Sequence, residues 1–300
     1  MRHGDDARWK EAWETLGSVS PRSLEQKRLE LHHAAQIVAA VGKTYLEPRP
    51  DDSHPNMGWV EEGSLLVGRA VPDLGLRAAL RVPQLTLLLC GDQSQVLDEL
   101  PLQGRRVDQA MDWLARQMAA HGGGEMRPLS PAGYDIPQHE VAKGLPFAEG
   151  GERDRSELAR WYANAHRALS AIASDHRGVQ VRIWPHHFDI GLLIVIDPSL
   201  PPEETTSVGA GMTPGDSDYA EPYWYVNPYP RPSVEDVSQL PPLQGKGHWH
   251  TVGWLGAVLT ASDLVGAEDS AGQAAQTEAY LRSALDAAGR LLGRQRQASS

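Results

Sequence analysis

HHFDIGLLIVID, residues 186–197, is the stretch on which the predicted fold depends. Its apolar part, IGLLIVI (190–196), is the longest apolar run of the chain, and it has the length of a buried strand rather than of a membrane-spanning helix. Strand-like segments stand on both sides of it: VQVRIW (179–184), PYWYVNPY (222–229) and HWHTVGWLGAVLT (248–260). These segments predict a β-sheet in the second part of the chain.

Outside these strands, helical and strand-like patterns alternate. Apolar residues recur at helical spacing in the ranges 24–42, 105–122, 155–178 and 271–293. In the first of these helices, Ser23 is the expected N-cap and Gly42 the expected end. Further strands are predicted at 58–71, 76–82 and 84–90. The order helix–strands–helix therefore occurs twice, and it predicts an α+β fold of antiparallel sheets with helices packed on one side.

The predicted organisation is two similar halves. The first half spans 1–124, a connection rich in proline and glycine spans 125–153, and the second half spans 154–300. The two halves are expected to form one compact unit. A long segment at 198–222, which contains GAGMTPGDSD, is interpreted as a loop, of the kind that often covers a functional site.

An internal duplication is one interpretation of this order. At one constant offset His33 aligns with His166, and His54 aligns with His187. A pseudo-twofold pair of α+β units would explain these matches. Chance identity is the alternative, and the sequence leaves both open.

Composition narrows the class of protein. The formal net charge of −11 over 300 residues argues against a general nucleic-acid binder, which needs a basic face. A single cysteine, Cys90, excludes an internal disulfide framework and a multi-cysteine zinc site. The N-terminal residues are charged and lack the pattern of a signal peptide, and no apolar run is long enough to span a membrane. We therefore expect a cytoplasmic protein without a membrane partner.

Two histidine-rich segments suggest a metal site. Alternate residues of a strand share a face, so His187 is paired with Asp189, and His248 with His250. If the two strands are neighbours, these four side chains converge. Two or three imidazoles with a carboxylate are typical ligands of zinc or ferrous iron. A metal-dependent hydrolase is one function that such a site would support; the alternative is that these histidines are ordinary residues at the edge of a core.

A small-ligand pocket is the second kind of site that the sequence suggests, and the interpretation that we favour. Tyr223 and Tyr225 share a strand face, and Trp184 is expected nearby, so these rings would line a pocket where the two halves meet. His32 and Gln36 lie one turn apart on a helix and could hydrogen-bond a ligand or each other. A protein-interaction module that uses exposed tryptophans is a third alternative. The ligand and the oligomeric state are not predicted.

Four segments resemble an uncharacterised family of bacterial proteins of about 300 residues, a domain of unknown function. They are LHHAAQIVAAVG (31–42), LPLQGRRVDQAMDWL (100–114), FDI (188–190) and YWYVNPYPRP (223–232). The resemblance implies a soluble bacterial protein and brings no activity. Members of the family have a Gly-Ser-Phe-Asp step, whereas here His186 and His187 directly precede Phe188 and Asp189. The histidine of the helix that matches the family is His32.

Overall fold

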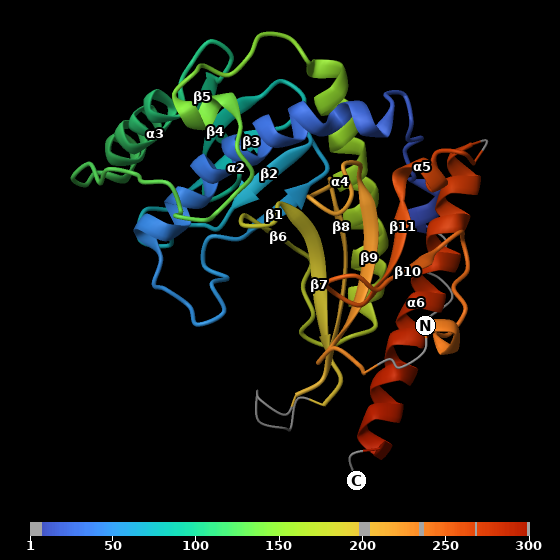
Figure 1. Ribbon diagram of the computed structural model, residues 1–300. Helices are drawn as coiled ribbons and strands as arrows, with labels where there is room; N and C mark the ends of the chain where they lie inside the picture. The colour runs from blue at the N-terminus through green and yellow to red at the C-terminus, as the bar shows by residue number, and fades with distance from the viewer. Residues whose placement is uncertain (1–7, 198–204, 234–236, 268, 299–300) are drawn as a thin grey trace. The chain divides into compact units, whose positions relative to one another are not determined.

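The computed structural model describes residues 8–197, 205–233, 237–267 and 269–298 (Figure 1). The chain divides into two compact units, neither of which is a continuous half of the sequence. Unit 1 comprises residues 1–22, 164–181 and 190–300, and unit 2 comprises residues 23–163 and 182–189. The segment predicted as a connection, 125–153, belongs to unit 2, where it contains the short helix η2 (Glu140–Lys143).

Unit 2 is built on an antiparallel sheet in the strand order β6-β1-β2-β3-β4-β5. Its strands are β1 (Met57–Val60), β2 (Leu65–Gly68), β3 (Leu76–Arg81), β4 (Thr86–Gly91), β5 (Val96–Pro101) and β6 (Arg182–Trp184). Two helices pack against this sheet: α2 (Glu25–Tyr45) contacts β2 and β3, and α3 (Val107–Gly122) contacts β4. Every residue of β4 is buried, which explains its continuous apolar pattern and the burial of Cys90.

Helix α2 is buried on all sides over most of its length, from Arg28 to Gly42. It is preceded by a short 3-10 turn, η1 (Pro21–Leu24), so its N-cap is Leu24 and not the predicted Ser23. It also continues three residues beyond the predicted end at Gly42. A Cβ atom on Gly42 would lie only 2.7 Å from Cα of Pro55. This glycine is therefore needed for the close approach of the following loop, not for ending the helix.

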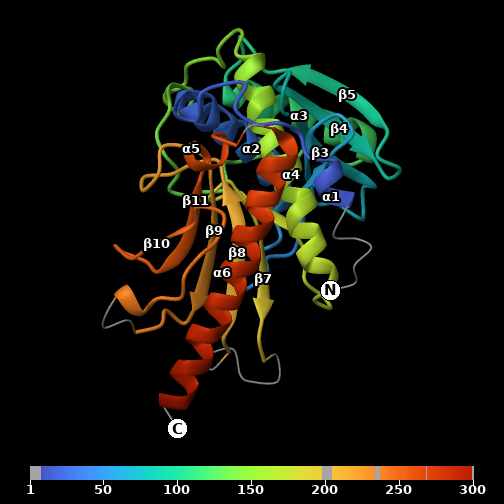
Figure 2. The same cartoon turned by 90° about the vertical axis from the view of Figure 1, so that its right-hand side faces the viewer.

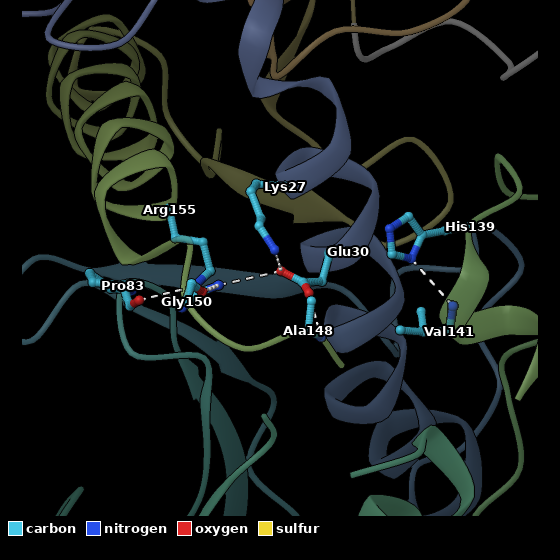
Figure 3. A network of polar contacts seen from close by, with 8 residues as sticks. All are labelled: Lys27, Glu30, Pro83, His139, Val141, Ala148, Gly150 and Arg155. Carbon is cyan, nitrogen blue, oxygen red and sulfur yellow. Dashed lines mark hydrogen bonds and ion pairs between the residues drawn. The ribbon is translucent and has the colours of Figure 1, made fainter. Parts of the chain in front are cut away.

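A buried ion pair joins α2 to the first turn of α4 (Glu152–Ser174), as Figure 3 shows. The Nη1 atom of Arg155 lies 3.4 Å from Oε2 of Glu30, and both side chains are almost completely buried. Arg155 also donates to the carbonyl oxygens of Gly150 at 2.7 Å and Pro83 at 3.0 Å. Glu30 accepts from the backbone N–H of Ala148 at 3.0 Å. These hydrogen bonds offset much of the cost of burying the two charges.

Unit 1 contains an antiparallel sheet in the strand order β10-β11-β9-β8-β7. Its strands are β7 (Asp189–Val195), β8 (Ser207–Thr213), β9 (Tyr223–Tyr229), β10 (His248–His250) and β11 (Gly256–Thr260). The short helices are α1 (Arg8–Glu11), η3 (Val237–Gln239) and α5 (Ala261–Leu264). The long helix α6 (Ser270–Ala298) lies over β8, β9 and β11 (Figure 2). The hydroxyl group of Tyr280, which is fully buried, joins helix to sheet by donating to the carbonyl oxygen of Ala257 at 2.8 Å.

Strand β8 was not predicted. Ser207–Thr213 was interpreted as loop because of its glycines, yet its residues are paired on both sides and are mostly buried. The glycines make room for side chains of β9. A Cβ atom on Gly211 would lie 2.4 Å from the hydroxyl oxygen of Tyr225, and one on Gly209 would lie 2.5 Å from Oδ1 of Asn227. The glycine-rich pattern of β8 is thus a packing requirement of the neighbouring strand.

Residues 185–188 form a turn, so the histidines at 186 and 187 are not part of a strand, which corrects the prediction; β7 begins only at Asp189. Phe188 has a φ of 58°, in the left-handed region that is rare for a bulky residue. Its N–H donates to the carbonyl oxygen of Trp184 at 2.7 Å, and its carbonyl oxygen accepts from the hydroxyl of Tyr162. The turn breaks the alternation of a strand, so His187 is exposed whereas Asp189 is buried.

The chain is thus an α+β protein whose strands pair antiparallel, as predicted. The predicted internal duplication is not shown: the two units differ in strand number and order. Among the residues that the structure describes, no helix is both long and apolar enough to cross a lipid bilayer.

Candidate functional site

The predicted ligand-binding residues His32 and Gln36 both contact one backbone carbonyl in unit 2. The Nε2 atom of His32 lies 2.8 Å from the carbonyl oxygen of Pro185, and Nε2 of Gln36 donates to the same oxygen at 2.7 Å. The ring of His32 stacks on Phe188 with centroids 5.0 Å apart. These two donors therefore hold the 185–188 turn against α2. The predicted Trp184 lies in the same turn region, in an edge contact with His186 at 5.9 Å.

Histidines are concentrated around α2 in unit 2. Burial lowers the pKa of His32 to about 4, against the opposing effect of its hydrogen bond to Pro185, and His33 lowers this pKa further. Burial is also the largest cause of a lowered pKa in four other histidines of this unit: His33, His54, His139 and His186. The neutral imidazole is therefore the form that the fold favours here.

Asp52, in the loop that follows α2, is the centre of a polar cluster that sequence reasoning missed. Lys43 donates to its Oδ1 atom at 2.6 Å, and the hydroxyl of Tyr134 donates to its Oδ2 atom. Burial raises the pKa of Asp52, but the hydrogen bonds from Lys43 and Tyr134 outweigh burial and hold it below its ordinary value. Burial and the contact with Asp52 raise the pKa of Tyr134. Each group of this cluster is paired with another, so the cluster stabilises loops rather than offering a free reactive group.

In unit 1 the predicted His248 and His250 share a face of β10 and meet a residue that was not predicted, Tyr219. Its hydroxyl oxygen lies 3.2 Å from Nε2 of His248 and 3.0 Å from Nδ1 of His250. We call Tyr219, His248 and His250 the His–Tyr cluster. The ring of His250 also stacks on Trp254 at 4.4 Å. Tyr219 lies in the segment interpreted as loop, where nothing in the sequence pattern pointed to it.

The four predicted metal ligands are divided between the units: His187 and Asp189 belong to unit 2, and His248 and His250 to unit 1. In the described ranges, no group of three or more histidine, cysteine, aspartate or glutamate side chains is arranged to hold a metal ion. The described part of the chain therefore gives no support to a zinc or iron centre built from these four residues, and that centre stays a prediction. The turn at 185–188 separates the orientations of His187 and Asp189.

Tyr223 and Tyr225, the other predicted pocket residues, have structural partners in unit 1. Tyr223 is buried, and its hydroxyl donates to Oδ2 of Asp216 at 2.5 Å. Tyr225 is half-buried, and it lies over Gly211 of the neighbouring strand. These contacts explain the positions of both tyrosine rings without a bound ligand.

A cavity of about 560 Å³ lies elsewhere in unit 1, among helices α1, α4 and α6. We call it the helical cavity. Its apolar wall consists of six side chains from the three helices: Trp9, Ala168, Ala171, Ile172, Leu281 and Leu285. Two cavities in unit 2 are smaller, at about 380 and 340 Å³. The α6 residues of the wall, together with Glu278 and Arg282, recur at helical spacing and therefore lie on one face of the helix. The sequence thus indicates this face, but not that it lines a cavity.

Four polar residues complete the helical cavity. Glu278 is already paired: Lys10 lies 2.7 Å from its Oε2 atom, and Arg282 lies 2.9 Å from its Oε1 atom. Asp175 and His176 follow the carboxyl end of α4, where the helix dipole places partial negative charge. Within the described ranges, the carboxylate of Asp175 has no ion-pair or hydrogen-bond partner. The cavity therefore has an apolar wall and one free negative charge.

Searches with protein-family models, among curated proteins and among solved structures find no match for this chain. The resemblance drawn from the four segments thus stays a prediction. The class that the fold and site define is an α+β protein with antiparallel strand pairing and a helix-lined cavity.

Proposed function

We propose that this protein binds a small organic cation with an apolar body in the helical cavity. The observation that carries the proposal is the cavity itself. Its volume of about 560 Å³ is that of a small-molecule site, and most of its lining is apolar with a few polar groups at the end of a helix. This proposal keeps the ligand-binding function predicted from sequence and moves the site from the predicted aromatic residues to the helices of unit 1.

The charge of the ligand follows from which groups are already paired. Glu278 is neutralised by Lys10 and Arg282, so neither it nor these cations is free for a ligand. Asp175 is the unpaired charge at the cavity among the described residues. An ammonium group beside Asp175 would complete an ion pair, and the indole ring of Trp9 is a further attractive surface for a cation. A carboxylate ligand would instead meet repulsion at this position.

Isothermal titration calorimetry with three matched probes tests the proposal: phenylbutylamine, phenylbutanol and phenylbutyrate. They share an apolar body and differ in charge. We expect binding in the order amine, alcohol, carboxylate. Ala171→Trp should abolish binding of all three by filling the cavity, because Ala171 is a half-buried wall residue whose replacement leaves the core intact.

Two acid-to-amide variants distinguish the effect of the charge at Asp175 on ligand binding from the effect of the overall charge of the protein. Asp175→Asn should weaken binding of the amine by about threefold to fivefold, the scale of a partly exposed ion pair, and leave the alcohol unchanged. Asp286→Asn is the matched control, since Asp286 is an exposed acid of α6 outside the cavity. Absence of binding by every probe would disprove the proposal, and equal effects of the two variants would disprove the role of Asp175.

A further inference from the structure

The His–Tyr cluster of unit 1, outside the helical cavity, brings together two imidazole nitrogens and a phenol oxygen that hydrogen-bond to one another. The hydroxyl oxygen of Tyr219 lies 3.2 Å from Nε2 of His248 and 3.0 Å from Nδ1 of His250. The two histidines are alternate residues of β10, so the strand fixes their common direction. The cluster is half-exposed and therefore accessible to a cation from solvent.

The hydrogen bond of the second ring nitrogen of His250 determines which nitrogen carries the proton. Nε2 lies 2.5 Å from the carbonyl oxygen of Val252, which can only accept a hydrogen bond, so Nε2 carries the proton. Nδ1 consequently presents its lone pair towards Tyr219. A ring held by a backbone carbonyl on one nitrogen, with the other nitrogen free to coordinate, is the usual arrangement of a metal-binding histidine.

The separation of the phenol oxygen of Tyr219 from each of the two imidazole nitrogens is close to that between ligands of one metal ion. Ligands about 2.0–2.1 Å from a tetrahedral zinc ion are separated from one another by about 3.3 Å. The observed separations of 3.0 and 3.2 Å need only a small adjustment to reach that value. Two imidazoles and one oxygen leave a fourth position for water.

Negative charge surrounds the cluster. Asp216 and Asp218 act electrostatically on Tyr219, and Asp263 acts on His248. Asp218 is held by Trp254, whose Nε1 atom donates to its Oδ2 at 2.8 Å, and that indole stacks on His250. These carboxylates favour a cation at the cluster, although Lys246, which donates to the carbonyl oxygen of Asp263 at 3.3 Å, offsets part of this charge.

We propose that Tyr219, His248 and His250 bind a divalent transition-metal cation of the zinc class. The imidazoles are the primary ligands and the phenol oxygen is the third. On coordination the hydroxyl proton of Tyr219 passes to solvent, and the proton on Nε2 of His248 moves by way of solvent to Nδ1, so binding weakens as the pH falls. The site differs from the four-ligand centre predicted from sequence, because it needs neither His187 nor Asp189.

Equilibrium dialysis of the full chain against Zn²⁺, with Co²⁺ as a spectroscopic probe, tests this site. We expect one ion per chain at the cluster and visible Co²⁺ absorption bands that depend on His250. His250→Gln should weaken binding by at least about tenfold while its amide preserves a donor for Val252. Tyr219→Phe should weaken binding by a smaller, measurable factor.

His187→Gln is the matched control, because His187 is an exposed histidine outside the cluster. Circular dichroism of the metal-free variants verifies that each is folded. The proposal is overturned if the unmodified chain retains no Zn²⁺, if His250→Gln or Tyr219→Phe binds as tightly as the unmodified chain, or if His187→Gln weakens binding as much as His250→Gln does.

Discussion

The Nε2 atom of His32 lies 2.8 Å from the carbonyl oxygen of Pro185, so a helix residue of unit 2 supports a turn more than 150 positions later. Since Pro185 offers only a carbonyl acceptor, His32 must carry its proton on Nε2. Burial then makes a second proton costly, and the pKa of His32 falls to about 4. This relationship links the stability of the fold to pH.

We expect stability to fall between pH 6.5 and pH 4. In that interval the unfolded chain binds a proton at His32 and the folded chain does not, so acidification favours unfolding. The lowered pKa corresponds to a contribution of about 3 kcal/mol to the free energy of unfolding. This contribution is fully present above pH 6.5 and is lost as the pH falls towards 4. Urea unfolding of the unmodified chain and of His32→Gln, each at pH 7 and pH 5, measures this loss of stability. The variant should lose less stability than the unmodified chain; an equal loss in both would contradict the assignment.

Breaking the buried ion pair should be costly. Arg155→Met leaves the buried Glu30 with Lys27 and the backbone N–H of Ala148, each at 3.0 Å, as its described partners, so we expect a loss of about 3–5 kcal/mol in the free energy of unfolding. Arg290→Met is the control, because its pair with Asp286 is exposed and should contribute less than about 1 kcal/mol. Chemical denaturation compares them. Similar losses of stability in both variants would show that the buried Glu30–Arg155 pair contributes no more to stability than an exposed pair.

Gly42→Ala tests the close approach of a loop to α2. The new Cβ atom would meet Cα of Pro55 at 2.7 Å and the carbonyl oxygen of His54 at 2.8 Å, both backbone atoms. We expect a loss of about 1–3 kcal/mol, the scale of overpacking, although alanine is the better helix former. Gly58→Ala, with open space at its Cβ position, is the control. Thermal unfolding that ranks Gly42→Ala as the more stable variant would refute this account.

Tyr280→Phe removes the hydroxyl group that joins α6 to the sheet of unit 1. The group donates to Ala257 at 2.8 Å and lies 3.3 Å from the carbonyl oxygen of Trp224. We expect a loss of about 1 kcal/mol, because the ring remains packed while one buried hydrogen bond is lost. Denaturant unfolding measures this loss. If the variant is as stable as the unmodified chain, the hydroxyl group of Tyr280 does not contribute to stability.

Several elements were predictable because their patterns are local. Helix α3 ends at Gly122, the last residue of the predicted range 105–122, and the next residue, Gly123, is left-handed. Strands β3 and β9 lie within predicted segments, β4 extends one residue beyond its predicted segment, and His248 and His250 share a face as strand geometry requires. Each of these features depends on neighbours in sequence.

Other elements were missed because their cause lies in a different segment. Strand β8 is rich in glycine since Tyr225 and Asn227 of β9 occupy the space above it. Tyr219 joins the histidines of β10 only after the chain has turned back. The helical cavity depends on three helices far apart in the chain, none of which shows it alone.

By itself, therefore, the sequence determined the class of fold, most helices and the direction of alternate side chains on single strands, because propensity and periodicity act over a few residues. Tertiary structure alone decided which histidines meet, which tyrosine joins them, and where a cavity is enclosed. The physical reason is that these features arise from packing between distant segments, whose partners no local pattern specifies.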